Sequence, residues 1–250
     1  MLRRLSGLLL ALALAAAVPA ALSTPSEGAA LATQRRPAVI GTKVIGHSVQ
    51  KRAIRAWHLG QPGKERVLLI ATMHGNEPAP RQILYRLRDG AAIRGINLWV
   101  VPVYNPDGLA HHTRKNAHGV DLNRNFPYKW ADLDGTYESG PHAASEPETR
   151  AMMRFLKRFR PAHILSFHQP FNAVDIDMKR PRWARKVARK LNLPTSNLDC
   201  GGVCHGTMTG WYNHRFKGAA VTVEYGPHPS RHRMRVTAPR QTLSIFGARR

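Results

Sequence analysis

Three of the histidine and glutamate side chains in this 250-residue sequence could together hold a divalent metal ion. His74 and Glu77 are three residues apart, and His168 follows much later in the chain. Two histidines and one glutamate, with one coordination position left to water, make up a recurrent catalytic zinc site. Glu224 is a fourth residue that could act there, as a ligand or as a base. The combination predicts a catalytic metal site built from distant parts of the chain.

The order of the apolar runs predicts that these side chains meet. The runs at 66–73, 163–168 and 219–225 are nearly continuous in apolar residues, as expected for strands buried on both faces of a sheet. The first run leads directly into the 74–77 segment, the second ends at His168, and the third has Glu224 as its next-to-last residue. Open α/β sheets place their sites at the C-terminal ends of strands, so one site could collect all four residues.

Each of these residues, taken alone, has a simpler interpretation. A His-Gly-Asn-Glu segment such as 74–77 also occurs by chance. His168 alone could be a hydrogen-bonded core histidine, and Glu224 alone could be a strand-end carboxylate in water. The metal site therefore depends on the combination of residue types and on their placement.

The rest of the pattern predicts one α/β domain at 44–250. Further strands are expected at 44–50, 53–58 and 96–104, and helices at 77–87, from Ser145 onwards, at 182–191 and at 239–249. Ser145 and Glu148 have the spacing of a helix capping box, and the long polar segment 109–137 has the character of a functional loop. Strands that alternate with helices predict a three-layer α/β/α sandwich with a mostly parallel mixed sheet.

The N-terminus has the features of a secretory signal peptide. A basic start at Arg3 and Arg4 precedes a short apolar run, and small residues follow at 18–20. We expect a signal peptide at 1–20, a linker at 21–43 and a secreted, periplasmic or cell-wall-associated mature protein without a transmembrane segment. An uncleaved membrane anchor is the alternative, although the apolar run is shorter than the roughly 18 residues typical of a spanning helix.

The formal net charge is +23, and removal of the signal peptide would leave +21. A field of this strength concentrates a protein on polyanions. For an exported protein, anionic cell-wall polymers or membrane surfaces are plausible partners, whereas nucleic acid is not expected because no recognisable binding motif accompanies the charge. The alternative is that scattered arginines only cover the surface.

Two cysteines, Cys200 and Cys204, lie close together in the chain. In an oxidising compartment such a pair is expected to form a disulfide. Because the closed loop is so short, this bond would stiffen a local turn more than it would stabilise the fold.

Five segments, in order, resemble the carboxypeptidase A family of zinc peptidases, and in particular its bacterial murein peptide amidase branch. The matching segments are 74–77, 114–127, 145–149, 166–168 and 221–224. The Gly-Val-Asp-Leu-Asn-Arg-Asn-Phe-Pro run at 119–127 is the most specific of them. The resemblance implies a peptidase that removes a C-terminal residue.

The resemblance also assigns roles to the residues at the predicted metal site. It implies that His74, Glu77 and His168 hold one zinc ion, which would activate water and polarise the scissile carbonyl. Glu224 would be the catalytic base, and Arg114 would stabilise charge that develops on the carbonyl oxygen.

Further residues are assigned to the substrate by the same resemblance. Asn123 and Arg124 would grip the free carboxylate of the substrate, because a planar guanidinium binds a carboxylate with two hydrogen bonds. Asp121 would orient the first zinc histidine. Digestive members of the family carry a tyrosine on a mobile loop. Tyr212 lies in about the corresponding region, but it could instead only pack.

The implied substrate is a peptide with a free C-terminal carboxylate. The first hypothesis is hydrolysis between γ-D-glutamate and a C-terminal diaminopimelate in murein peptides. A general secreted carboxypeptidase acting on ordinary peptides would use the same catalytic residues. A deacylase of acylated amino acids matches the Asn123–Arg124 region less well. A non-catalytic wall-binding protein on a peptidase scaffold would be expected to lack a ligand or the base.

Overall fold

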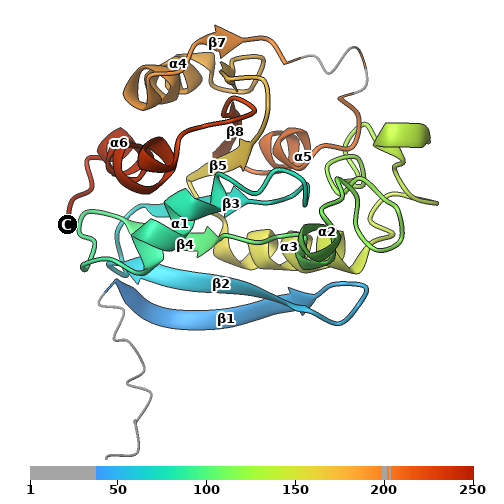
Figure 1. Ribbon diagram of the computed structural model, residues 1–250, viewed down its shortest axis with the longest axis horizontal. Coiled ribbons are helices and arrows are strands. Elements are labelled where there is room, and N and C mark those ends of the chain that lie inside the picture. Colours follow the sequence, from blue (N-terminus) through green and yellow to red (C-terminus); the bar gives the residue numbers. More distant parts are fainter. Residues whose placement is uncertain (1–37, 199–201, 203) are drawn as a thin grey trace, which may run out of the picture. The chain divides into compact units, whose positions relative to one another are not determined.

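The computed structural model describes residues 38–198, 202 and 204–250 and has a single mixed β-sheet at its centre (Figure 1). The eight strands follow the order β1-β2-β4-β3-β5-β8-β6-β7 across the sheet. Their bounds are β1 Val39–His47, β2 Ala53–Gly60, β3 Arg66–Ala71, β4 Asn97–Val101, β5 His163–His168, β6 Ala173–Asp175, β7 Thr195–Ser196 and β8 Ala219–Glu224.

The middle of the sheet is parallel and its edges are mixed. Strand β3 lies between β4 and β5, and β5 pairs in parallel with β8. Strands β1 and β2 form an antiparallel hairpin, and β6 runs antiparallel to β8. The parallel register places His168 directly beside Glu224, so the last residues of β5 and β8 meet at one edge of the sheet.

Helices cover both faces of the sheet and complete the predicted three layers (Figure 1). Their bounds are α1 Arg81–Arg88, α2 Pro106–His111, α3 Pro147–Phe159, α4 Pro181–Leu191, α5 Met208–Arg215 and α6 Ala238–Ile245, with short 3₁₀ and π turns at Gly135–Tyr137 and Arg233–Thr237.

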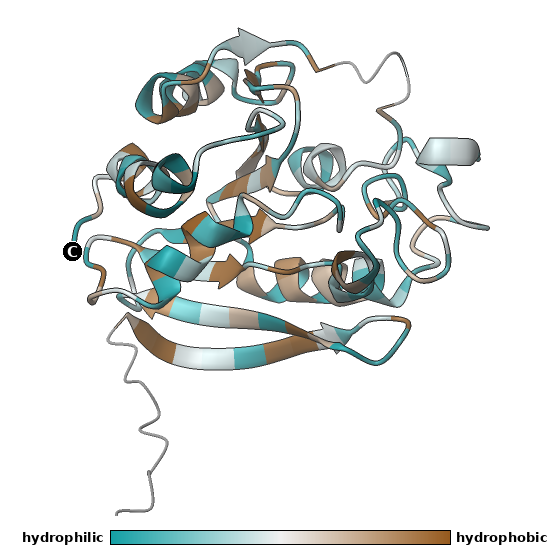
Figure 2. Cartoon of the chain, viewed as in Figure 1, coloured by the Kyte–Doolittle hydropathy of each residue, from teal (hydrophilic) through white to brown (hydrophobic). Residues whose placement is uncertain are grey.

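Each face of the sheet has its own hydrophobic core. Val67 and Leu69 of β3 pack in the core with α1, α4 and α6, whereas Leu68 and Ile70 pack in the core with α3 and α5. This alternation is the two-residue period of a strand buried on both sides. The central strands are accordingly the most hydrophobic part of the ribbon, whereas the helices alternate in colour (Figure 2).

The start of the domain differs from the sequence prediction. Strand β1 begins at Val39, so residues 39–43 belong to the sheet and not to a linker. Their backbone pairs with β2, from Val39 opposite Leu59 to Lys43 opposite Ala56, which fixes them despite their polar neighbours. The predicted signal peptide and the linker before residue 38 lie outside the described residues.

The start of the first helix also differs from the prediction. Helix α1 begins at Arg81 and not at residue 77. Pro78 and Pro80 disfavour helical conformation in the residues before them, which leaves Glu77 in a loop.

The capping box predicted for α3 is absent, because loop residues engage both of its side chains. The Ser145 hydroxyl donates to Glu146 and accepts from Asn125, and Glu148 accepts from the backbone of Val49. Glu146 takes the N-cap position without a side-chain cap.

Within the residues that the structure describes, no helix combines the length and the apolar character needed to span a membrane.

Candidate metal and peptidase site

The loop after β3 carries the first two predicted metal ligands. Thr72 turns the chain out of the strand with a φ of 55°, and the backbone then closes a tight turn in which the Glu77 N–H donates to the His74 carbonyl over 3.1 Å. Gly75 allows this loop to lie against α2, since a Cβ there would lie 1.9 Å from the backbone of Gly108. The close approach explains why glycine separates the ligand histidine from the ligand glutamate.

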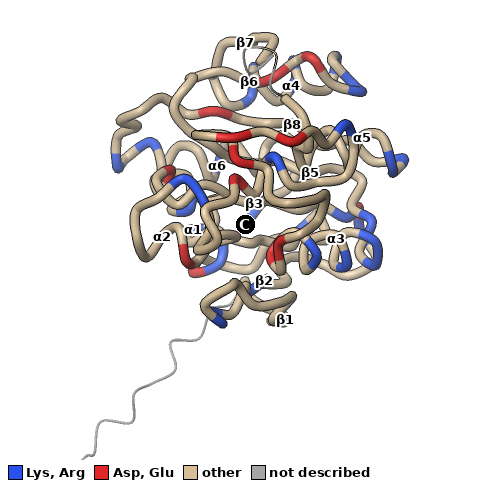
Figure 3. Tube along the Cα trace, turned by 90° about the vertical axis from the view of Figure 1, so that its right-hand side faces the viewer, with Lys and Arg blue, Asp and Glu red and all other residues tan. Residues whose placement is uncertain are grey.

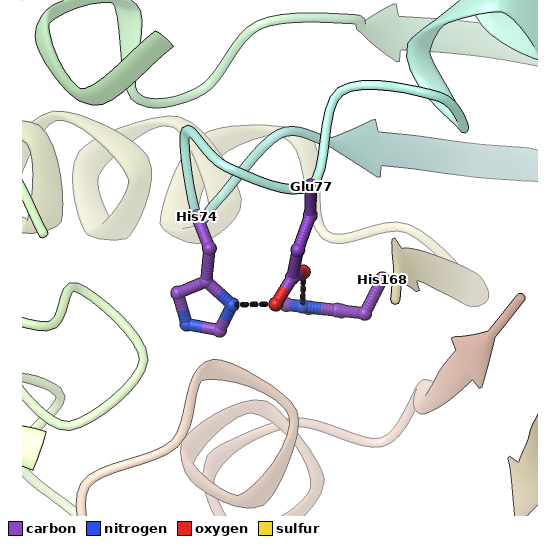
Figure 4. A group of neighbouring side chains, drawn as sticks. All are labelled: His74, Glu77 and His168. Atoms are coloured by element: carbon purple, nitrogen blue, oxygen red, sulfur yellow. Dashed lines mark hydrogen bonds and ion pairs between the residues drawn. The ribbon is translucent and has the colours of Figure 1, made fainter. Parts of the chain in front are cut away.

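The three predicted ligands meet around the carboxylate of Glu77 (Figure 4). Nδ1 of His74 lies 2.7 Å from one carboxylate oxygen, and Nδ1 of His168 lies 2.9 Å from the other. All three side chains are buried, and their candidate ligand atoms lie within 4.8 Å of one another. Two imidazole nitrogens and a carboxylate oxygen are the donor set of a catalytic zinc site, so the residues fit a single zinc ion.

The outer nitrogen of each histidine is held by a second side chain. Nε2 of His74 lies 3.0 Å from a carboxylate oxygen of Asp121, and Nε2 of His168 lies 2.9 Å from the Ser166 hydroxyl. Such partners fix which ring nitrogen faces the metal and hold the ring in orientation. Both imidazoles therefore present Nδ1 to the same point.

The electrostatics of the cluster favour a cation at its centre. Burial opposes charge on His74, but the carboxylates of Glu77 and Asp121 outweigh it and raise its pKa to about 9. Burial likewise opposes ionisation of Glu77, but the two histidines lower its pKa far below the usual range. The two carboxylates thus favour positive charge at this point, which a bound metal ion would supply in place of a proton.

Glu224 lies at the end of β8, beside the ligand His168 in the sheet. It is buried, and its Oε2 has no hydrogen-bond partner among the described residues. Burial raises its pKa above the ordinary value, and the nearby carboxylate of Glu77 adds to the effect. A buried carboxylate with a free oxygen and a raised pKa has the properties of a general base.

Asp121 organises the loop that carries the predicted substrate residues. Besides His74, its carboxylate accepts from Nε of Arg114 over 2.9 Å and from the backbone N–H of Asn123 over 2.8 Å. Arg114 also approaches Glu77, with 3.5 Å between Nη1 and Oε1. The prediction that Asp121 orients His74 therefore agrees with its contacts, and the same carboxylate also positions Arg114.

Arg124 is buried although it is charged. Its Nη1 donates to the Asn123 carbonyl over 2.8 Å, and its Nε has no hydrogen-bond partner among the described residues. Burial lowers its pKa, and Tyr137 lies under the guanidinium at 4.8 Å from ring centroid to Cζ. A buried guanidinium with a free donor is a site for an anionic group, because an unsatisfied buried charge is costly.

These residues line a single cavity of about 740 Å³. The walls include the three candidate ligands and Glu224, together with Arg114, Asn123, Arg124 and Tyr137. The cavity therefore brings a candidate metal site, a candidate base and a candidate carboxylate site within reach of one small substrate.

Comparison with known proteins assigns the chain to a family. The sequence model of the zinc carboxypeptidase family matches residues 29–174, a stretch that includes all three candidate ligands. The chain belongs to the zinc carboxypeptidase family. It is a metallopeptidase hydrolase, and one zinc ion is the cofactor of this family.

Among its relatives, this zinc carboxypeptidase is similar to bacterial amidases. It is 30% identical over 173 residues to murein peptide amidase A of Escherichia coli (strain K12), covering 62% of this chain and 69% of that protein. It is 28% identical over 209 residues to murein peptide amidase A of Vibrio campbellii, covering 78% of this chain and 83% of that protein.

Solved structures agree with these sequence matches. The murein-tripeptide amidase of Escherichia coli O157 matches with a TM-score of 0.66 and 26% identity over 83% of this chain and 92% of that one. The carboxypeptidase A of Helicoverpa armigera matches with a TM-score of 0.69 at 17% identity over 84% of this chain and 68% of that one, a likeness of fold alone. The fold and the murein amidase branch predicted from the sequence are confirmed.

Sequence patterns missed two residues of this zinc carboxypeptidase site. Ser166 precedes His168 by two residues on the same strand, so both side chains lie on the same side, and this spacing was the available signal. Tyr137 lies at the end of a loop, and no pattern predicts that its ring contacts both Arg114 and Arg124.

The structure does not bring Tyr212 to the cavity. Its ring is fully buried and stacks on Phe216, and its hydroxyl donates to the Pro161 carbonyl. Helix α5 directs this side chain into the core on one face of the sheet, so the predicted substrate contact is wrong. The predicted Cys200–Cys204 disulfide stays a prediction, because Cys200 lies outside the described residues.

Proposed function

We propose that this zinc carboxypeptidase hydrolyses the amide bond before the C-terminal residue of a cell-wall peptide, between γ-D-glutamate and diaminopimelate. The observation that carries the proposal is the shared cavity of the ligands, Glu224 and the buried guanidinium of Arg124. The choice of murein over other peptides is supported by the similarity to murein peptide amidases of other bacteria.

In the proposed reaction the substrate carboxylate is bound first. Arg124 and Asn123 lie side by side on the cavity wall, and a carboxylate would satisfy the free Nε of Arg124. This contact places the last amide bond of the peptide, and no internal one, near the base. The enzyme would therefore cleave only the bond before the C-terminal residue, because only that bond lies near Glu224 when the carboxylate is bound to Arg124.

In the chemical step one proton moves from water to Glu224 and then from Glu224 to the leaving amine. Bound zinc supplies a Lewis acid that makes water more acidic and polarises the scissile carbonyl. Glu224 accepts a proton from the attacking water at its free oxygen and returns it to the leaving amine, since its raised pKa suits both transfers. Arg114, held by Asp121, faces the same cavity and stabilises negative charge on the carbonyl oxygen.

The substrate assignment is tested with matched peptides. We expect the purified protein to release diaminopimelate from a murein tripeptide and to act far more slowly on blocked dipeptides that end in ordinary amino acids. Mass spectrometry of the digests, with and without a chelator, measures both. Cleavage of the dipeptides with no loss of diaminopimelate would instead support a general carboxypeptidase.

We also propose that the protein is exported and retained at an anionic surface of the cell wall. Lys and Arg residues lie on many elements of the fold (Figure 3). Several of them gather around a second cavity, of about 920 Å³, that contains one acidic residue, Glu65. The cations that line it are Lys64, Arg66, Lys157, Arg160, Arg180, Arg215 and Lys217. Such a cavity would attract a polyanion.

Export and retention are tested by one extraction. Washing producing cells with increasing salt should release a protein that begins after residue 20, because salt screens attraction between charges. N-terminal sequencing of the released fraction measures the cleavage. Recovery of the intact N-terminus from the cell interior, or release in water alone, would contradict this proposal.

A further inference from the structure

The part of the cavity beyond Glu224 is where the side chain of the substrate's last residue must lie. Arg124 and Asn123 would hold the carboxylate, and Glu224 marks the reacting bond. The remaining wall includes residues of β6, β8 and α5, with Asp175, Thr209 and Thr222 among them, and loop residues such as Lys129, Phe171 and Asn197. Groups on this wall are the ones able to recognise what the C-terminal residue carries.

The strand register places a carboxylate on that wall. Strand β6 is antiparallel to β8, with Ala173 opposite Glu224 and Val174 opposite Val223. Continuing this register puts Asp175 beside Thr222. Because alternate residues of a strand share a face, Asp175 lies on the same face as Glu224, about 7 Å further along the sheet. Both residues line the cavity.

Asp175 is half-buried, and among the described residues no cationic side chain forms a hydrogen bond or an ion pair with it. One carboxylate oxygen accepts from the backbone N–H groups of Asp177 over 2.9 Å and Leu198 over 3.4 Å, which fixes its direction. Burial raises its pKa to about 6, and the neighbouring charge that acts on it is the like charge of Asp177.

Two other cavity atoms indicate that a ligand completes this site. Oε2 of Glu224 and Nε of Arg124 are buried and lack hydrogen-bond partners among the described residues. Both groups belong to side chains that are at most 6% exposed. Buried polar groups are almost always satisfied, so these atoms mark where a substrate binds.

We propose that Asp175 determines specificity by binding a positively charged amine on the side chain of the C-terminal residue. The inference deepens the proposed function, on which it rests: diaminopimelate carries a second amine, whereas most ordinary C-terminal residues do not. A charge-assisted hydrogen bond to Asp175 stabilises the bound amine, and a neutral side chain leaves the carboxylate unpaired.

The test uses two tripeptides that differ by a single amine, one ending in diaminopimelate and one in 2-aminopimelate. We expect the wild-type protein to prefer the first in kcat/KM by about 10-fold to 100-fold. Asp175→Asn should abolish this preference by slowing the first substrate without slowing the second, whose side chain ends in a carboxylate alone and is repelled by Asp175 in the wild-type protein. Asn keeps an oxygen for the two backbone donors, and the second substrate reports on folding. The control is Asp132→Asn, which removes an exposed charge outside the cavity.

The outcomes distinguish a failure of the Asp175 assignment from a failure of the proposed hydrolysis. If Asp175→Asn keeps the wild-type preference, or if Asp177→Asn abolishes it instead, the assignment to Asp175 is overturned while hydrolysis of both peptides upholds the proposed function. If the wild-type protein cleaves neither peptide, the proposed function fails and takes the inference with it.

Discussion

Replacing Glu224 by Gln is expected to lower kcat by about 100-fold to 10,000-fold, the usual contribution of a general acid–base group. The amide has nearly the shape of the carboxylate but cannot accept the proton. Because burial already disfavours the ionised form of Glu224, a neutral group at this position should not destabilise the fold. Single-turnover release of the C-terminal residue from the tripeptide measures the effect.

This loss must occur with the metal still bound. Glu224 is outside the group of candidate ligands, so the variant should retain as much zinc as the wild-type protein. Glu65→Gln is the matched control, since Glu65 lines the other cavity and should leave kcat unchanged. Full activity of Glu224→Gln at equal zinc content would exclude Glu224 as the base.

Replacing His168 by Ala is expected to remove both zinc and activity. Two protein ligands would remain where a catalytic zinc site has three, and the second oxygen of Glu77 would keep only the longer hydrogen bond from the Gln169 backbone. Ser166→Ala should have a smaller effect in the same direction, weakening zinc binding by about 10-fold to 100-fold, because it frees the His168 ring to turn. Competition for zinc with a coloured chelator measures both affinities.

The graded order of these two variants is the informative result. His142→Ala controls for the loss of an imidazole, since His142 is exposed and outside the cavity. If Ser166→Ala bound zinc as tightly as the wild-type protein, the hydrogen bond to His168 would have no orienting role. If His168→Ala kept its zinc, the site would have to be placed elsewhere.

The central sheet was predictable because its strands are buried on both faces. Runs such as 66–73 and 163–168 contain few polar residues, so their apolar length alone identifies them, and the side chains that follow them lie at one edge. The site residues at strand ends were predictable for the same reason. Asp121 and Arg124, in contrast, lie on an irregular loop, and only a resemblance to a family indicated their roles.

Short elements and long-range contacts were not predictable in this way. Strand β6 has three residues, too few to show an apolar period. Its Asp175 reaches the cavity because β6 pairs with β8, a contact that no local sequence pattern predicts. Tyr212 is of a residue type that often contacts substrates, but helix α5 directs its side chain into the hydrophobic core. The capping box failed because Ser145 met a partner from a distant loop, Asn125, which no local pattern contains.

Zinc titration of the metal-free protein tests the central claim most directly. We expect no hydrolysis of the tripeptide after chelation, and then a linear recovery of activity that ends at one zinc per chain, because one group of His74, Glu77 and His168 holds the ion. Activity that survives chelation, or recovery that continues well beyond one equivalent, would contradict a single zinc site at these residues.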